Sequence, residues 1–266
     1  MAQNEKSAGE KNLLAVDVGN TRTRLGLFSG SELVGTWELT THERLTADEA
    51  RMQLAQVLAL MGERLPDDAI LACVVPMLTD VWRRALAASC PGRTYVVGPG
   101  LKTGLKMRYD DPSEVGADRV ADVVAARADY GAPAVVVDLG TTTNFEVLDA
   151  DGAFAGGIIA PGLALGARSL SEAAARLPMI ELRAPTSVIG RNTRSAMQSG
   201  VVLGEVARID GLLDAVMREL GVDAPVIMTG DGAEAMAALL RHEVTVDDTL
   251  TLRGLHHIWL ANRPRR

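Results

Sequence analysis

The sequence predicts an α/β protein made of two similar halves, each a partly parallel sheet covered by helices. Two observations support this fold class. Short apolar runs typical of strands alternate with helical stretches along the 266 residues, as in sheets covered by helices. An Asp-x-Gly-x-Thr pattern also occurs twice directly after an apolar strand, at Asp17 and 121 residues later at Asp138. Because both copies lie between two strands, we interpret them as an internal duplication.

Composition excludes several other classes of protein. Apolar residues make up 47% of the chain, which is enough to fill a core, so a disordered chain is excluded. The formal charge of −7 argues against non-specific binding of nucleic acid. No apolar run reaches the roughly 18 residues of a membrane span, and residues 1–11 lack the apolar stretch of a secretory signal. We therefore expect a soluble, cytoplasmic protein with a flexible N-terminal tail at residues 1–11.

The two cysteines do not indicate a metal centre. Neither Cys73 nor Cys90 belongs to a Cys/His cluster with metal-ligand spacing, and His256 and His257 are adjacent and point in different directions. Cys73 lies inside the apolar run 70–75, so we expect a buried and inert thiol. The sequence therefore predicts no zinc site.

The first half is expected at residues 12–133. A strand that ends at Asp17 is followed at hairpin distance by a second strand, and a turn at residues 29–31 leads into a third. Helical periodicity and short apolar runs alternate after this point. The predicted strands cover residues 13–16, 24–28, 33–39, 69–75 and 94–97, and the predicted helices cover 47–65, 77–88 and 112–128.

The second half is expected at residues 134–266 and begins in the same way. An apolar strand ends at Asp138, and Asp151-Gly152 is a typical hairpin turn between the next two strands. The predicted strands cover residues 134–137, 145–148, 153–155 and 225–228, with a short one near Val244. The predicted helices cover residues 162–177, 193–220, 233–241 and 254–262.

The repeated turn contains the residue types that bind phosphate groups. Glycine lets the backbone approach a ligand, so that amide N–H groups face phosphate oxygens, and a threonine hydroxyl adds a neutral donor. An aspartate at the strand end repels phosphate unless a cation lies between them. The alternative is that Asp17 and Asp138 only cap their turns. Two matched turns, followed by a third glycine turn at residues 229–232, favour a nucleotide cleft.

The duplicated architecture resembles the actin, hexokinase and Hsp70-type ATPase fold, which is ribonuclease H-like. A P-loop is absent, and so is the dinucleotide fingerprint after the first strand. The resemblance is more specific to type III pantothenate kinases, because six blocks occur in that family's order over nearly the whole chain. These blocks are Asp17-Val18-Gly19-Asn20-Thr21, Gly116-Ala117-Asp118-Arg119, Asp138-Leu139-Gly140-Thr141, and residues 156–162, 189–193 and 196–200.

The resemblance implies a kinase that uses ATP with Mg²⁺ to phosphorylate the primary hydroxyl of pantothenate, the first committed step toward coenzyme A. Asp118 would be the general base, and Asp138 would hold a monovalent cation, K⁺ or NH₄⁺. The ATP contacts would be Asp17, Val18, Gly19, Asn20, Thr21, Arg22, Thr23, Arg24 and Thr141. The pantothenate contacts would be Tyr109, Gly116, Ala117, Asp118, Arg119 and Thr193.

Each of these residues also has an ordinary structural interpretation. Asp118 lies near a helix start, where the helix dipole stabilises a carboxylate. Arg119 has two competing structural uses, a surface ion pair or a pair with Asp122 one turn further along the helix. We expect the effect of Asp122→Asn on activity to be mild. Tyr109 is compatible with the edge of a core, and Thr193 with a helix N-cap.

Three positions depart from the family's usual pattern. Asn144 and Glu146 stand where Thr and Asp are common, and both keep hydrogen-bonding capacity. The turn Thr229-Gly230-Asp231 stands in place of Thr-Gly-Gly, so Asp231 adds a charged side chain where close backbone approach is expected. A shift of one residue would let Gly232 take over that approach.

Two rival functions stay open. One is a kinase of the same fold that acts on a sugar or another small acid. The other is a non-catalytic relative that senses a ligand or assists transcription, against which both phosphate turns and Asp118 argue. The resemblance also implies a homodimer, and the stretch 197–220 has the wide apolar surface that a subunit contact would use.

Overall fold

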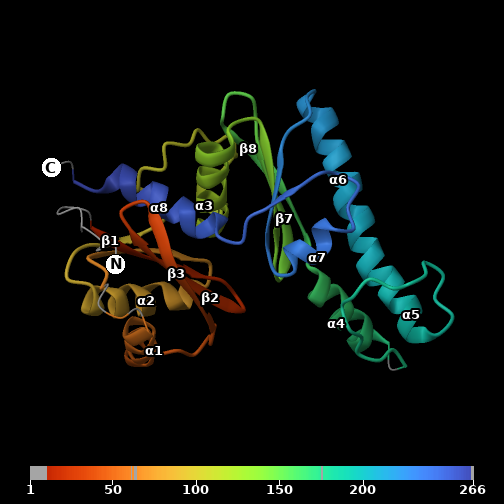
Figure 1. Cartoon of the computed structure of the whole chain (residues 1–266), viewed down its shortest axis with the longest axis horizontal. Helices are drawn as coiled ribbons and strands as arrows, with labels where there is room; N and C mark the ends of the chain where they lie inside the picture. The colour runs from red at the N-terminus through yellow and green to blue at the C-terminus, as the bar shows by residue number, and fades with distance from the viewer. Residues whose placement is uncertain (1–10, 61, 63–64, 175, 265–266) are drawn as a thin grey trace, which may run out of the picture. The chain divides into compact units, whose positions relative to one another are not determined.

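The computed structural model describes residues 11–60, 62, 65–174 and 176–264, and the chain forms two compact units (Figure 1). Unit 1 takes the described residues of Met1–Gly104, Ser113–Ala125 and Thr251–Arg266, and unit 2 takes those of Leu105–Pro112 and Ala126–Leu250. The expected tail, apart from Lys11, lies outside the described residues. The expected halves at 12–133 and 134–266 are each one continuous stretch of sequence, whereas each compact unit combines separate stretches. The boundary between the two halves therefore stays a prediction.

Unit 1 contains a five-stranded mixed sheet in the order β3-β2-β1-β4-β5. The first three strands pair antiparallel, and β4 and β5 are parallel to β1. Residues Leu13 to Val16 of β1 are fully buried, as expected for a central strand covered on both faces. The strands are β1 (Asn12–Val18), β2 (Arg22–Ser29), β3 (Glu32–Thr40), β4 (Asp68–Cys73) and β5 (Thr94–Val96).

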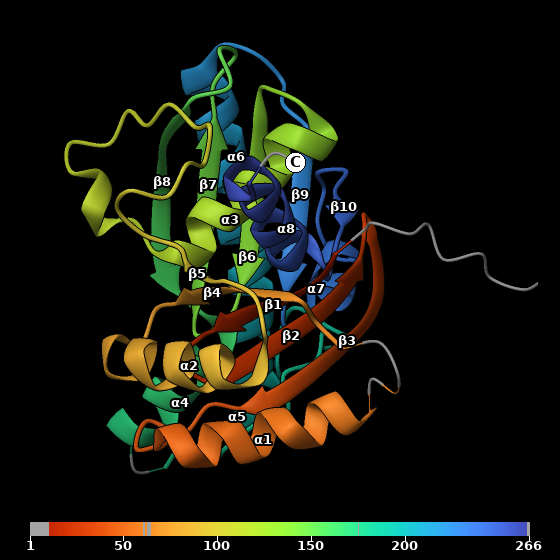
Figure 2. The same cartoon turned by 90° about the vertical axis from the view of Figure 1, so that its left-hand side faces the viewer.

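Helices cover both faces of this sheet. On one face, α1 (Ala47–Leu60) and α2 (Pro76–Ser89) lie side by side and pack Leu54 and Trp82 into the core (Figure 2). On the other face, α8 (Leu250–Asn262) stacks His256 on Phe28, with ring centroids 4.5 Å apart. Helix α3 (Ala117–Ala125) packs closely against α8, because a Cβ on Gly254 would lie 1.9 Å from the Ala121 carbonyl oxygen.

Unit 2 contains a second five-stranded mixed sheet in the order β10-β9-β6-β7-β8. Helix α6 (Gly204–Leu220) runs along one face, where Ile209 and Leu213 pack on Val137 and Phe145 (Figure 1). Most of the apolar surface expected on residues 197–220 is therefore used inside this unit. The strands are β6 (Ala134–Leu139), β7 (Thr142–Leu148), β8 (Phe154–Pro161), β9 (Val226–Gly230) and β10 (Thr245–Val246). Two mixed sheets covered by helices confirm the predicted α/β fold class.

The predicted helices at 112–128 and 193–220 each contain a π-helical stretch. A short 3-10 helix (Pro112–Glu114) precedes α3, and a π-helix (Ala126–Tyr130) follows it. Another π-helix (Ser199–Leu203) joins α5 (Thr193–Gln198) to α6. The predicted helix at 162–177 is shorter in the structure, where α4 spans Leu163–Ala173.

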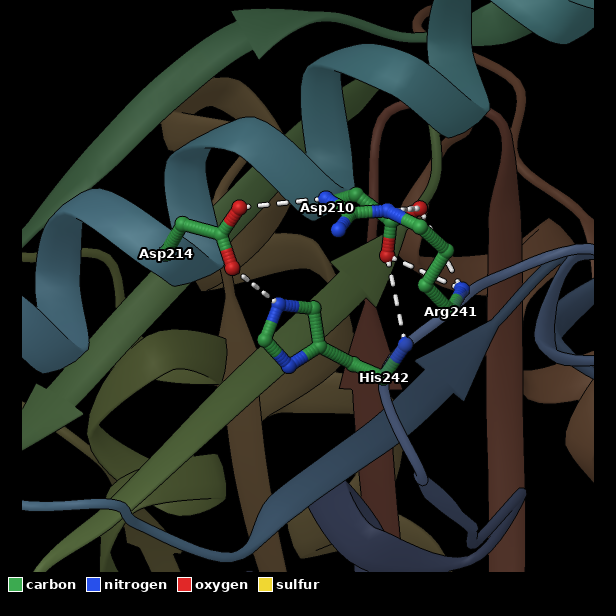
Figure 3. A network of polar contacts seen from close by, with 4 residues as sticks. All are labelled: Asp210, Asp214, Arg241 and His242. Carbon is green, nitrogen blue, oxygen red and sulfur yellow. Dashed lines mark hydrogen bonds and ion pairs between the residues drawn. The ribbon is translucent and has the colours of Figure 1, made fainter.

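The helix predicted at 233–241 ends early, and the structure gives the reason. Helix α7 spans only Ala233–Ala237. The backbone N–H groups of Arg241 and His242 donate to the carboxylate of Asp210 on α6, at 3.1 to 3.3 Å (Figure 3). The N–H groups of Leu239 and Leu240 donate to carbonyls only three residues earlier, so the α-helical pattern is lost after Ala237, and Asp210 then binds the Arg241 N–H that would continue it. A sequence window around α7 does not contain Asp210.

The two sheets match in strand order and in a local irregularity, which supports an internal duplication. Strands β1, β2 and β3 correspond to β6, β7 and β8, and β4 and β5 correspond to β9 and β10. The register between the second and third strands shifts after Leu27 in unit 1 and after Val147 in unit 2. These two positions are equivalent, so both sheets have a β-bulge at the same place.

The turn between the first two strands differs by one residue between the units. The Gly19 N–H donates to the carbonyl of Arg22, whereas the Gly140 N–H donates to that of Thr142. The predicted match of Thr21 with Thr142 is therefore wrong, because Arg22 is the equivalent of Thr142. Beyond the turn the two sheets are again in step, so equivalent residues lie opposite the two aspartates, Arg24 for Asp17 and Asn144 for Asp138.

Candidate active site

In unit 1, Asp17 is the penultimate residue of β1 and lies on the sheet face away from α1 and α2, because its neighbours Val16 and Val18 pack against those helices. Arg24 lies opposite Asp17, and Glu38 of β3 lies opposite Arg24. Glu38 Oε1 accepts from Nη1 of Arg22 at 2.8 Å, and its Oε2 lies 3.6 Å from Nε of Arg24. Two guanidinium groups held beside a glycine turn suit an anionic ligand.

Two of the eight residues predicted to line the ATP phosphates point elsewhere. The Val18 side chain is fully buried in the core under α1 and α2. Thr23 is also buried, and its hydroxyl lies 2.9 Å from that of Thr41. Only the backbone of these two residues is therefore available to a ligand, which is the ordinary result of side-chain alternation along a strand.

Asp118 lies in the first turn of α3, as the sequence predicts. Its Oδ1 accepts from the backbone N–H of Arg119 at 2.7 Å. Burial raises the pKa of the Asp118 carboxyl above its ordinary value, although the backbone N–H and the charge of Arg119 oppose this shift. A Cβ on Gly116 would lie 2.5 Å from Oδ1 of Asp118, so a side chain there would displace this carboxylate. A carboxyl of raised pKa suits a general base.

Arg119 and Asp122 are both buried, with 6% and 1% of their surfaces exposed. The interpretation of Arg119 as half of a surface ion pair is therefore wrong. The burial of Asp122 also makes it unsuitable as a mild control for Asp118, because a change to a buried charged group disturbs the core. An exposed carboxylate such as Glu114 is the better control.

Cys73 was not predicted to belong to this region. It ends β4 opposite Val18, and its half-buried thiol donates to the Val75 carbonyl at 3.2 Å. Burial raises the thiol pKa most, and the negative charges of Asp17 and Asp118 raise it further. The expectation of a fully buried thiol is wrong, and the apolar run around Cys73 in the sequence hides its place near both carboxylates.

In unit 2, Asp138 is the penultimate residue of β6 and lies between two polar side chains on neighbouring strands. Asn144 of β7 and Thr229 of β9 both lie directly opposite Asp138, so the three share one sheet face. Oδ1 of Asn144 and Oγ1 of Thr229 are buried and have no hydrogen-bond partner among the described residues. A carboxylate between two neutral oxygens is a fitting donor set for a hard cation. The sequence alone does not reveal this row, because the register brings it together.

The turn after β9 has its close backbone approach at Gly230, not at Gly232. Gly230 has φ +89°, and a Cβ there would lie 2.2 Å from the Leu139 carbonyl oxygen and 2.5 Å from Oδ1 of Asp138. Asp231 is exposed, and its backbone N–H donates to that same carbonyl. The expectation that Gly232 takes over the close backbone contact is therefore wrong, because Gly230 makes that contact and Asp231 does not stand in its place.

The remaining predicted contacts belong to three segments of unit 2. Thr141 is exposed in the turn after β6. Tyr109 is half-buried, with its ring centroid 5.4 Å from that of Phe154. Thr193 is exposed at the first position of α5, and the N-cap is Asn192, whose side chain accepts from the Ser195 N–H at 2.9 Å. The interpretation of Thr193 as an N-cap is therefore wrong.

No group of three or more His, Cys, Asp or Glu side chains in the described part of the chain is arranged to hold a metal ion. No helix in the described residues is long and apolar enough to cross a membrane.

Comparison of the sequence with known families gives one clear match. The family model described as type III pantothenate kinase matches residues 13–215. The type III pantothenate kinase of Moorella thermoacetica is 40% identical over 256 residues, covering 94% of this chain and 99% of the relative. The enzyme of the same name from Acidobacterium capsulatum is 40% identical over 262 residues and covers 96% of each chain.

Comparison of the fold finds more distant neighbours. The ethanolamine utilization protein EutJ of Carboxydothermus hydrogenoformans aligns with a TM-score of 0.56 and 18% identity, over 96% of this chain and 92% of that one. MreB 5 of Spiroplasma citri bound to AMPPNP aligns with a TM-score of 0.53 and 10% identity, over 92% and 95%. At such low identity these likenesses show the fold, which is the duplicated actin/hexokinase-like ATPase fold.

Proposed function

Because the chain belongs to the type III pantothenate kinase family, it phosphorylates pantothenate from ATP in coenzyme A biosynthesis, and we propose which of its residues carry out that reaction. Membership also implies ATP together with a divalent metal, for which we propose Mg²⁺. The observation that carries the residue assignment is the Asp118 carboxyl, which has a raised pKa at the start of α3 in the same unit as Asp17.

Asp118 is the general base that accepts the proton of the pantothenate hydroxyl. Its carboxyl must be ionised to accept a proton, and a pKa raised toward the working pH makes it a stronger acceptor once ionised. Arg119, with Gly116 and Ala117, contacts pantothenate, whose carboxylate suits a guanidinium group. Tyr109 and Thr193 are the other two proposed contacts. Support for them is the resemblance to the family.

The turn from Asp17 to Arg24 binds the ATP phosphates. Arg22 and Arg24 supply positive charge, and Glu38 holds both guanidinium groups in place before ATP arrives. Backbone N–H groups of the turn add donors, and the carboxylate of Asp17 suits the divalent metal that accompanies ATP. In unit 2, Thr141 is a further ATP contact.

Asp138 holds the monovalent cation, K⁺ or NH₄⁺. The row formed with Asn144 and Thr229 supports this role, because two buried oxygens that have no partner among the described residues flank the carboxylate. A bound cation supplies positive charge beside the polyphosphate. Gly230 keeps the space beside Asp138 free of a side chain.

An assay of ADP release with MgATP tests both the substrate and the cation. We expect turnover with pantothenate and none with sugars or other short acids, and we expect almost no activity when Na⁺ replaces K⁺ or NH₄⁺. K⁺ should also raise the Tm of the unmodified protein more than Na⁺ does, and Asp138→Asn should remove that difference. Full activity in Na⁺ alone would exclude the cation role of Asp138.

We also propose a homodimer and a cytoplasmic location. The dimer is supported by exposed apolar side chains that occur along α4 and along the segment that leads to α5; these are Leu165, Leu170, Met179, Leu182, Val188 and Ile189. The location is supported by the free thiols of Cys73 and Cys90, which are typical of a reducing compartment. A non-catalytic role is disfavoured, because Asp118 and both phosphate turns are present.

A further inference from the structure

A polar cluster that the proposed roles do not use lies behind the nucleotide turn Gly140–Thr142, on the sheet face that carries α6. It consists of Thr143 on β7 and of Glu205 and Arg208 on α6. The Thr143 hydroxyl donates to Oε1 of Glu205 at 2.6 Å, and the two residues are 1% and 5% exposed. A carboxylate buried this deeply lowers the stability of the folded protein unless well-placed partners compensate its lost hydration.

Arg208 links this pair to the end of β8. Its Nη2 contacts Oε2 of Glu205 and also donates to the carbonyl oxygen of Pro161 at 2.6 Å. The same guanidinium nitrogen therefore binds the buried carboxylate and the last backbone carbonyl of β8. The carboxylate in turn binds β7, so α6 is connected to two neighbouring strands by three side chains.

Both connected strands border the turn. Thr143 is the second residue after Thr141, and Pro161 directly precedes Gly162. The Gly162 N–H donates to the Thr141 carbonyl at 3.1 Å, and a Cβ on Gly162 would lie 2.2 Å from the Gly140 carbonyl oxygen. The backbone that follows Pro161 therefore packs directly on the turn. Any movement at Thr143 or Pro161 reaches Thr141 through one or two peptide units.

We propose that Glu205 is a positioning residue for ATP, acting through Thr143 on one side of the turn and through Arg208 and Pro161 on the other. This inference rests on the proposed contact of Thr141 with ATP. Phosphoryl transfer depends mainly on the positioning of the phosphates and on charge stabilisation. A turn that is free to shift therefore lowers the affinity for ATP and slows the transfer, while the binding of pantothenate is unaffected.

The test compares Thr143→Val with Thr143→Ser in the full-length protein. Valine keeps the shape of threonine but removes the hydroxyl, whereas serine keeps the hydroxyl that Glu205 accepts. We expect Thr143→Val to raise KM for ATP about tenfold, the effect of losing one hydrogen bond of typical strength. Thr143→Ser should restore KM to within about threefold, and KM for pantothenate should not change in either variant. Glu205→Gln and Arg208→Lys should act in the same direction, and the more exposed Arg208 gives a variant that folds readily.

A matched control separates positioning from stability. Asp68 is a fully buried carboxylate at the end of β4 away from Asp17, where it accepts from Lys11, Trp259 and the Arg93 N–H. Asp68→Asn should lower Tm without changing KM for ATP. If Thr143→Val and Glu205→Gln likewise lower Tm and leave KM for ATP and kcat within twofold, the cluster is only structural and the proposal is wrong. If Thr141→Ala itself leaves KM for ATP unchanged, the assumed ATP contact fails instead.

Discussion

Single residues decide the chemistry of unit 1, and Asp118 is the most informative of them. Replacement by asparagine keeps the size of the side chain but removes the proton acceptor. We expect Asp118→Asn to lower kcat by at least about 100-fold, the usual contribution of a positioned base, with little change in ATP affinity. Steady-state kinetics and ATP titration measure both effects. Glu114→Gln, an exposed change four residues earlier, is the control and should be nearly silent.

The raised pKa of Asp118 also predicts a change in stability. A carboxyl whose folded pKa lies above its unfolded pKa is stabilising when protonated, and it loses that contribution as the pH rises through the folded pKa. At neutral pH the ionised Asp118 therefore costs stability, so Asp118→Asn should raise Tm there and not at low pH. The acid limb of kcat/KM should lie above the ordinary Asp value of about 3.9. A lower Tm at neutral pH, with only a few-fold loss of kcat, would identify Asp118 as a helix-end carboxylate.

Gly230 allows a second comparison between single residues. Alanine at Gly230 places a methyl group against the Leu139 carbonyl and the Asp138 carboxylate, in addition to the strain of φ +89°. Alanine at Gly232 meets only the strain of φ +74°, which costs roughly 1–2 kcal/mol. We expect Gly230→Ala to impair ATP binding severely and Gly232→Ala to affect mainly stability.

The exposed side chain of the intervening residue provides the third member of this series. Asp231→Gly, which restores the family's usual turn, should change KM for ATP less than twofold, because Asp231 is exposed and the close backbone contact is made by Gly230. A large gain in ATP affinity for Asp231→Gly would show that its charge does reach the nucleotide. Isothermal titration with ATP distinguishes these outcomes for all three variants.

At the scale of elements, strands were predicted well and helix ends poorly, for a physical reason. Strand identity depends on apolar runs that are visible locally, and each predicted strand overlaps or adjoins an observed one, although β7 begins three residues before its predicted start and β8 runs six residues past its predicted end. The end of α7 depends on Asp210, which lies more than twenty residues earlier on α6. Register has the same limitation, since Asp-x-Gly-x-Thr looks alike in both turns although Arg24 faces one aspartate and Asn144 the other.

The network around Asp210 fixes the segment after α7, and its contribution to the unfolding free energy can be tested (Figure 3). Asp210 is nearly fully buried and accepts from two backbone N–H groups, whereas Asp214 is more exposed and binds the side chains of Arg241 and His242. Asp210→Asn leaves buried donors facing an amide N–H and should cost about 1–3 kcal/mol in unfolding free energy.

Asp214→Asn is the matched partner of that variant and should change stability little at neutral pH, because exposed ion pairs contribute weakly. Hydrogen bonds from Arg241 and then His242 hold the pKa of Asp214 below its ordinary range. Whatever Asp214 contributes is therefore present above the ordinary Asp pKa and is lost as the pH falls through the lowered value. Urea unfolding of both variants measures the difference, and equal losses would contradict this ranking.

For the whole molecule, the distribution of exposed apolar side chains predicts the assembly. Val188 and Ile189 are 73% and 80% exposed on the segment before α5. An apolar patch of this kind is typical of a protein contact. We expect a dimer at micromolar concentration by light scattering, and we expect Ile189→Asp to shift it toward the monomer. Met77→Asp, at an equally exposed apolar residue of α2, should leave the dimer intact. A fully active monomer at micromolar concentration would exclude the proposed dimer.

The bulge shared by the two sheets carries information about descent. A β-bulge is retained within a family as part of its fold, and two independent insertions at the same register would be a coincidence. One ancestral segment that already had the bulge was therefore copied, and the one-residue difference between the turns arose later. At the equivalent position opposite the aspartate, one copy now presents the guanidinium group of Arg24 and the other the carboxamide of Asn144, so the two turns are no longer chemically equivalent.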